Sequence, residues 1–179
     1  MIFKPLVRYF LRRNARNRNR KSAAIVPARS QRVVVIGRQH DHGFKYVLDY
    51  VNTLRNRGYR EVNFFVLFKS EKSRRNSAFD KSYIFTMSPA SFGFLGKIKS
   101  ATPAAVLSST YDFLIDLTAT DDLLGEILVG KVDATWKVGR RNSSYHYAFD
   151  LMIDWPTDPM DQFIHHLDNY LMKLNTDHV

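Results

Sequence analysis

The chain has 179 residues, carries a formal net charge of +10, and 45% of its residues are hydrophobic. These totals favour one globular domain and exclude a chain that is disordered throughout. The absence of cysteine excludes disulfides, thiolate catalysis and cysteine zinc sites, and it is compatible with a reducing cytosol.

The positive charge is concentrated at the start of the chain. Residues 1–32 contain ten of the 27 basic residues and no acid, so residues 33–179 contain 17 bases and all 17 acids. The remainder of the chain is therefore neutral. Only the N-terminal segment has a bulk attraction for anionic partners.

The first 13 residues are amphipathic at helical spacing. Apolar side chains occupy one half of the helical wheel, while Lys4, Arg8 and Arg12 occupy the other. Lys4 and Arg8 interrupt the apolar stretch of a would-be secretory signal, whereas an arginine-rich start without acids also fits an organellar transit peptide in a eukaryote. Residues 12–21 are polar all round, and no apolar run approaches the roughly 18 residues of a spanning helix. We expect residues 1–30 to be a basic amphipathic segment followed by a linker.

From Arg32 onward, apolar strands alternate with amphipathic helices. We expect strands at 32–37, 61–68, 82–87, 111–117, 134–139 and 149–154, and helices at 44–58, 102–109, 121–131 and 160–174. Residues between 68 and 82 are expected to form a charged loop. This alternation predicts a small Rossmann-like α/β domain over residues 31–179, with a mostly parallel sheet and helices on both faces.

The first strand is followed by the loop "GRQHDHGFK", which is neither a dinucleotide-binding nor a phosphate-cradling glycine motif. His40 and His42 could chelate a metal if the loop curled, but the loop offers no third ligand. We expect a solvated polar turn and no metal site. An anion at the start of the following helix is the alternative.

A second loop, "DLTATDD", carries Asp116, Thr118 and two further carboxylates. Paired carboxylates could perform acid–base chemistry if a cleft raised the pKa of one of them. The alternative is that Thr120 or Asp121 caps the next helix while the acids complement its dipole. We favour capping.

A third loop, "KVGRRNSSYHY", contains a basic cluster inside the neutral domain. Arg140 could grip a phosphate or carboxylate in a bidentate fork, although a solvated loop is the alternative. Any ligand site is expected to use the following residues of the second and third loops: Asp116, Thr118, Lys137, Arg140 and Arg141. No nucleophile elbow or Ser-His-Asp spacing is present. We assign no catalytic residue and no cofactor.

The segments "YDFLIDL", "VGKVDATWKVGR" and "FDLMIDW", followed by "FIHHLDNYLMKL", resemble an uncharacterised family of short Gram-negative bacterial proteins. The resemblance implies an α/β domain behind an amphipathic basic start, and it implies no activity. A weaker similarity, from Asp112–Asp116 to Val138-Gly139, is to the N-terminal half of heptosyltransferase-like sugar transferases. Those enzymes bind the nucleotide sugar mainly in a second domain, for which this chain has no room.

Three functions are compatible with these patterns. The first is a non-enzymatic cytoplasmic domain attached peripherally to the inner membrane, with the N-terminal helix contacting anionic lipid. The second is an RNA- or DNA-binding protein that uses the arginine-rich tail, and the third is a sugar- or nucleotide-binding domain. The N-terminal helix could alternatively dock on the domain or pack in a dimer. Membrane or nucleic-acid contact is expected from the following N-terminal residues: Phe3, Leu6, Phe10, Arg12, Arg13, Arg16, Arg18, Arg20 and Lys21.

Overall fold

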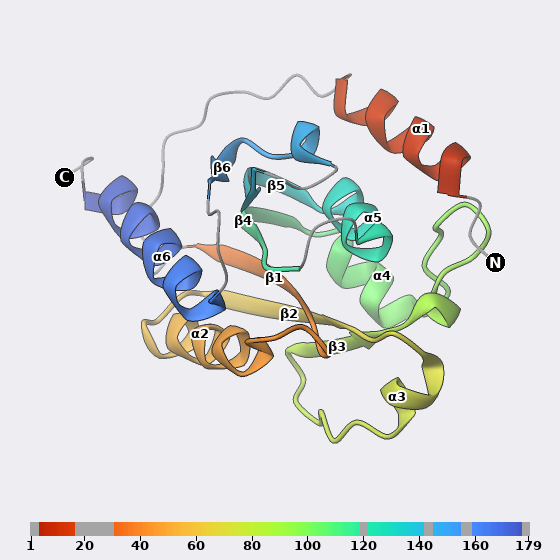
Figure 1. Cartoon of the computed structure of the whole chain (residues 1–179), viewed down its shortest axis with the longest axis horizontal. Helices are drawn as coiled ribbons and strands as arrows, with labels where there is room; N and C mark the ends of the chain where they lie inside the picture. The colour runs from red at the N-terminus through yellow and green to blue at the C-terminus, as the bar shows by residue number, and fades with distance from the viewer. Residues whose placement is uncertain (1–3, 17–30, 119–121, 142–144, 155–158, 177–179) are drawn as a thin grey trace.

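The computed structural model describes residues 4–16, 31–118, 122–141, 145–154 and 159–176 (Figure 1). Its centre is a six-stranded sheet in the order β3-β2-β1-β4-β5-β6, and every pair of neighbouring strands is parallel. The strands are β1 (Arg32–Arg38), β2 (Glu61–Leu67), β3 (Ile84–Met87), β4 (Thr110–Asp116), β5 (Asp133–Arg140) and β6 (Leu151–Ile153). This is the strand order of a Rossmann fold, and the order reverses between β1 and β4. The predicted Rossmann-like α/β class is confirmed.

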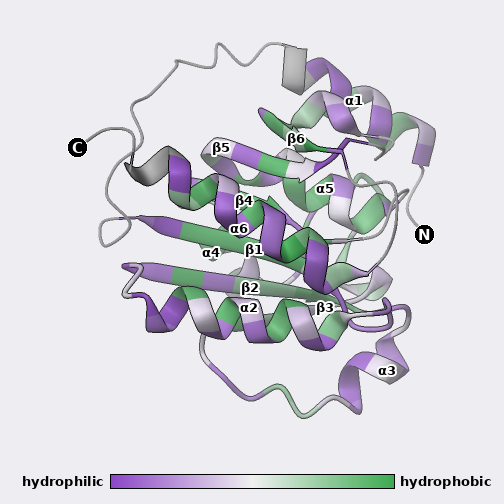
Figure 2. Ribbon diagram, turned by 60° about the vertical axis from the view of Figure 1, so that its left-hand side comes forward, coloured by the Kyte–Doolittle hydropathy of each residue, from purple (hydrophilic) through white to green (hydrophobic). Residues whose placement is uncertain are grey.

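Helices cover both faces of the sheet (Figures 1 and 2). One face is covered by α2 (Phe44–Asn56) and α6 (Met160–Thr176), and the other by α1 (Lys4–Arg16), α4 (Ala101–Leu107) and α5 (Leu123–Lys131). Single turns of 3₁₀ helix, η2 (Pro89–Ser91) and η3 (His146–Ala148), complete the connections. No helix in the described part of the chain is long and apolar enough to cross a bilayer.

The segment after β2 differs from the sequence prediction. It contains a short helix, α3 (Glu71–Arg75), where a charged loop is expected. Ser70 caps this helix by accepting a hydrogen bond from the Ser73 N–H at 3.1 Å, and Glu71 pairs with Arg74 within it. The helix buries no side chain, so apolar periodicity could not reveal it.

The face under α2 and α6 is an apolar core. The strands contribute alternate residues to it, which the pleat directs to one side of the sheet. Its most buried helical members are Val47, Val51, Leu54, Phe163 and Leu167. The start of α2 approaches α6 closely, because a Cβ on Gly43, whose φ is +89°, would lie 2.5 Å from the Met160 Cβ.

The opposite face contains buried polar groups among its apolar residues. The buried Asn63 of β2 donates from Nδ2 to the Tyr111 hydroxyl at 2.9 Å. Asp116, Glu126 and Lys137 are also buried, each at 3% exposure or less. The candidate site lies on this face and at the carboxyl ends of its strands.

Candidate functional site

The carboxyl ends of β1 and β4 lie side by side where the strand order reverses, which is where ligands bind in sheets of this class. In this structure an ion pair joins Arg38, at the end of β1, to Asp122, the residue before α5. Asp122 also caps α5 by accepting hydrogen bonds from the N–H groups of Leu124 and Gly125, at 2.9 and 3.3 Å. The preference for a helix cap is correct in kind, but the cap is Asp122 and not Thr120 or Asp121, because α5 begins only at Leu123.

Asp116 lies at the end of β4 in a buried hydrogen-bond network. Its Oδ1 accepts from the backbone N–H and the hydroxyl of Thr118, at 3.0 and 2.8 Å, and its Oδ2 accepts from the Tyr145 hydroxyl at 2.7 Å. Thr118 and Tyr145 are 3.0 Å apart at their hydroxyl oxygens. Both carboxylate oxygens therefore have donors from the protein itself.

Burial dominates the electrostatics of this network. Desolvation raises the pKa of Asp116 to about 6, although the donors from Tyr145 and Thr118 oppose the shift. Burial also raises the pKa of the Tyr145 phenol well above its usual value. A Cβ on Gly125 would lie 2.9 Å from the hydroxyl oxygens of both Thr118 and Tyr145, so α5 packs directly onto the network.

The three basic residues of the predicted ligand site do not converge. Lys137 is 1% exposed, and its Nζ donates to the Val129 carbonyl of α5 at 2.5 Å. Arg140 lies on the other face of the sheet, with its guanidinium 4.7 Å from the centre of the Phe163 ring. Arg141 is exposed and 3.5 Å from Asp154. Asp116 and Thr118 are in contact, whereas the bases occupy three separate environments.

The loop after β1 leaves the imidazoles of His40 and His42 exposed. Among the residues that the structure describes, no group of three or more His, Asp or Glu side chains could hold a metal ion.

The N-terminal helix α1 packs against α5. Val7 is 3% exposed and belongs to the same core cluster as the apolar residues of α5. Leu11 lies directly over Gly130, where a Cβ would collide with its side chain. The apolar contact of α1 therefore depends on two residues one helical turn apart and on a glycine of α5.

Polar contacts reinforce the docking of α1. Glu126 of α5 is 2% exposed and accepts from Arg8 Nε at 2.9 Å and from the Tyr147 hydroxyl at 2.8 Å. Arg12 lies over the Tyr147 ring, 5.6 Å from its centre. Burial and the carboxylate of Glu126 raise the pKa of Tyr147, which keeps this phenol protonated as a donor. Arg8 thus neutralises a carboxylate that would otherwise be buried without a charged partner.

The outer side of α1 carries two exposed aromatic residues. Tyr9 and Phe10 are 58% and 43% exposed and contact each other edge to face at a ring separation of 5.7 Å. Leu6 is half-buried, and Arg12 and Arg13 are exposed. Phe3, Arg18, Arg20 and Lys21 lie outside the described residues, as does the side chain of Arg16.

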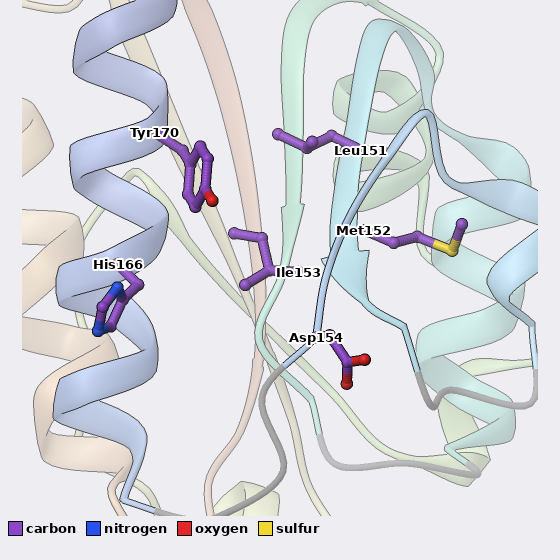
Figure 3. Close-up of a pocket in the computed structure, with 6 residues that line it drawn as sticks. All are labelled: Leu151, Met152, Ile153, Asp154, His166 and Tyr170. Carbon is purple, nitrogen blue, oxygen red and sulfur yellow. The ribbon is translucent and has the colours of Figure 1, made fainter.

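A cleft of about 340 Å³ separates β6 from α6 (Figure 3). Leu151, Met152, Ile153 and Asp154 line it on the strand side, and His166 and Tyr170 on the helix side. In Figure 3 the Tyr170 ring points toward the strand across the cleft. The cleft is open and mixed in character, and it contains none of the predicted ligand residues.

Two residues complete the buried polar clusters, Tyr145 and Glu126. The sequence placed Tyr145 in the third loop without pairing it with Asp116, and Glu126 was missed. The burial of Glu126 could have been predicted from the sequence, because this residue lies inside the apolar run "LLGEILVG". A carboxylate inside such a run needs a buried partner.

The family model for DUF6913, a family of unknown function, matches residues 4–174. The chain belongs to this family. The DUF6913 match includes α1 as well as the α/β domain, so the docked N-terminal helix lies within the family's common region. Neither the curated proteins nor the solved structures contain a match to the chain.

Proposed function

We propose that this protein is a non-enzymatic α/β domain that attaches peripherally to the anionic inner surface of a membrane through α1. The observation that carries the proposal is the division of α1 into two sides. Val7 and Leu11 hold the helix against α5, while Tyr9 and Phe10 face outward. The packing of α1 on α5 does not use this outward aromatic pair.

The charge around this aromatic pair suits an anionic surface. Residues 1–32 contain ten bases and no acid. Aromatic rings enter the interfacial region of a bilayer, and each lysine or arginine near anionic lipid adds about 1 kcal/mol of binding. Because Arg8 is committed to Glu126, the attraction would come from the exposed Arg12 and Arg13 and the basic residues that follow.

A second exposed apolar patch supports the same orientation. Phe94 and Leu95 are 59% and 52% exposed at the tip of the turn before α4, and exposed Lys97 follows them. Gly96 of this turn packs toward Ile127 of α5, the helix that also carries α1. Both patches are therefore fixed to α5, and a membrane would meet the molecule on the α1 and α5 side.

The buried network around Asp116 supports a non-catalytic role. Its two carboxylate oxygens are both used by donors of the protein, and Lys137 and Arg140 lie on opposite faces of the sheet. A sugar or nucleotide would need these groups to converge.

The test is flotation of the full chain with phosphatidylcholine vesicles containing 30 mol% phosphatidylglycerol, a lipid fraction chosen as about that of an anionic bilayer. Tyr9→Glu together with Phe10→Glu should lower the vesicle partition coefficient about a hundredfold or more, since each lost aromatic contact is worth roughly 1.5–3 kcal/mol. The matched control is Tyr46→Glu with Tyr170→Glu, which changes two exposed aromatics on the opposite side of the sheet. The control should float like the unaltered chain.

Two outcomes would overturn the proposal: no flotation of the unaltered chain, or equal loss in the control. Binding to RNA that survives the Tyr9 and Phe10 changes, and that weakens with salt at a log–log slope of about −0.7 per phosphate contacted, would instead assign the basic segment to nucleic acid.

A further inference from the structure

A groove of about 550 Å³ follows the outer edge of β3, which is the first strand in the order of the sheet. All four residues of β3, Ile84–Met87, line it. One wall is formed by α3, and the other by η2, the start of α4, and Lys99 and Ser100 between them. In Figure 1, α3 and the green segment before α4 lie on either side of β3. The groove is therefore as long as the strand that forms its floor.

The backbone of β3 presents free hydrogen-bonding groups to this groove. Its inner side is used by β2, because Phe64 N–H donates to the Tyr83 carbonyl at 2.8 Å and Phe68 N–H donates to the Met87 carbonyl at 2.7 Å. Backbone groups alternate in direction along a strand, so those of Thr86 point to the open side. Within the described residues, the Thr86 N–H and carbonyl have no backbone partner. The floor of the groove is an unpaired strand edge.

The walls of the groove are positively charged. Arg74 and Arg75 line it from α3 and Lys99 lines it from the opposite wall, against one acid, Glu71. Glu71 is already occupied by Arg74, Arg75 and the Ser88 hydroxyl, at 2.6, 3.0 and 2.6 Å. These donors hold the pKa of Glu71 far below its usual value, with Arg74 as the largest cause. The remaining charge of the lining is positive on both walls.

We propose that the outer edge of β3 binds an extended, acidic peptide segment of a partner protein as a seventh strand of the sheet. The Thr86 backbone would supply the ladder hydrogen bonds, as in other cases of strand addition. Acidic side chains alternate to the two faces of such a peptide, so they would meet Arg75 on one side and Lys99 on the other. This site is independent of the membrane proposal.

Charge decides between this occupant and the others. A second copy of the chain would place its own Arg74, Arg75 and Lys99 against the same three residues. Residues 17–30 of the chain itself contain bases and no acid, so they would also be repelled. An acidic segment of another protein is the occupant that the groove attracts.

The probe is the fluorescein-labelled peptide acetyl-Glu-Val-Glu-Glu-Val-Glu-amide, titrated into the full chain and followed by fluorescence anisotropy. Two versions N-methylated on alternate residues separate strand addition from simple charge attraction. One version blocks the N–H groups that face β3, and the other blocks those that face away. We expect one methylated peptide to bind like the parent and the other to bind about tenfold or more weakly, since its ladder hydrogen bonds are lost.

The matching change in the protein is Arg75→Glu with Lys99→Glu. Both side chains are exposed, and Arg75 makes one bond to Glu71. Arg74 is left in place because it makes two bonds to Glu71 and keeps this carboxylate paired. Replacing two attractions by repulsions should weaken the probe about tenfold or more. The control, Lys45→Glu with Lys131→Glu, changes net charge equally at exposed positions away from the groove and should bind as the unaltered chain does.

Four results would overturn the proposal. Equal binding of the two methylated peptides would mean that the probe binds the basic tail by charge alone. No binding of the parent peptide would mean that the β3 edge does not bind acidic strands. A dimer in sedimentation analysis that the Arg75 and Lys99 changes alter would give the groove to a second copy. Displacement of the probe by inorganic phosphate, but not by chloride at the same ionic strength, would show that the groove is an anion-binding site.

Discussion

The two faces of the sheet differ in what they bury. The face under α2 and α6 is an apolar cluster that includes Phe64, Phe113 and Phe163. On the opposite face, Asn63, Asp116 and Lys137 project from three strands and find polar partners on Tyr111, Tyr145 and Val129, respectively. One sheet therefore combines a face built for packing with a face that holds ionisable groups.

Because of this difference, the two faces should contribute differently to the pH dependence of folding. Apolar contacts are insensitive to pH and salt, whereas buried ionisable groups make folding depend on protonation. The helix with an exposed aromatic side, α1, is docked on the ionisable face through Glu126. Changes on the first face should thus alter stability at every pH, and changes on the second should alter its pH dependence or the position of α1.

The largest effect is expected for Phe163→Ala on the apolar face. Phe163 is 0% exposed and is covered by the Arg140 guanidinium, so its removal leaves a cavity. The free energy of unfolding in urea should fall by about 3–5 kcal/mol. Tyr170→Ala, on the same helix but 53% exposed, serves as the control and should change it by less than about 0.5 kcal/mol. A loss below about 1 kcal/mol at Phe163 would contradict the assignment of this face as the main core.

The second effect concerns Asp116 on the ionisable face. Its pKa is raised to about 6 from 3.8, so between these values the folded state holds a proton that the unfolded state has lost. The contribution of Asp116 to the free energy of unfolding is therefore greatest below about pH 4. It falls as pH rises to 6, by up to about 3 kcal/mol at 1.36 kcal/mol per pKa unit.

Asp116→Asn should remove this contribution, because the amide cannot ionise. Urea unfolding at pH 4, 5, 6 and 7 measures the slope in both proteins. Phe163→Ala should retain the slope of the unaltered chain, which would separate the two faces. An Asp116→Asn slope equal to that of the unaltered chain would show that other groups set the pH dependence.

The smallest effect is expected for Val7→Ala in α1. Val7 is the one described residue of α1 that is fully buried, and removing two methyl groups costs about 1.5 kcal/mol at roughly 0.8 kcal/mol per carbon. Hydrogen exchange should show faster exchange of α1 amides with unchanged protection in α6. Protection lost equally in both helices would mean that α1 is an integral part of the core.

The strands could be predicted from the sequence because their signal is local. β1, β2 and β4 are rich in apolar residues, and each observed strand lies within two residues of its predicted ends. The last helix could be predicted for the same reason. Phe163, Leu167 and Leu171 recur at helical spacing, and all three are buried. The C-terminal end of α1 could not be predicted. The amphipathic pattern ends at residue 13, whereas the helix continues to Arg16 through residues that are polar all round.

The buried polar clusters could not be predicted, because their partners are distant in the chain. Arg8 and Glu126 are 118 positions apart, and Asp116 and Tyr145 are 29 apart. The strand pattern placed Asp116, Lys137 and Arg140 at neighbouring strand ends, but the predicted strand ended at residue 139. Because β5 continues to Arg140, the pleat directs Lys137 and Arg140, three positions apart, to opposite faces. Which side each residue takes depends on register, and register depends on the whole sheet.

The lengths of the strands have a consequence for self-association. The inner strands β1, β2, β4 and β5 have seven or eight residues, whereas the edge strands β3 and β6 have four and three. An unpaired edge is a template for aggregation, and a short edge offers few rungs for another chain. The shortest strands of the fold therefore lie at the two edges, where strand pairing between molecules would begin. Lengthening β3 with β-branched residues at its ends should make the protein aggregate on concentration, which light scattering would detect.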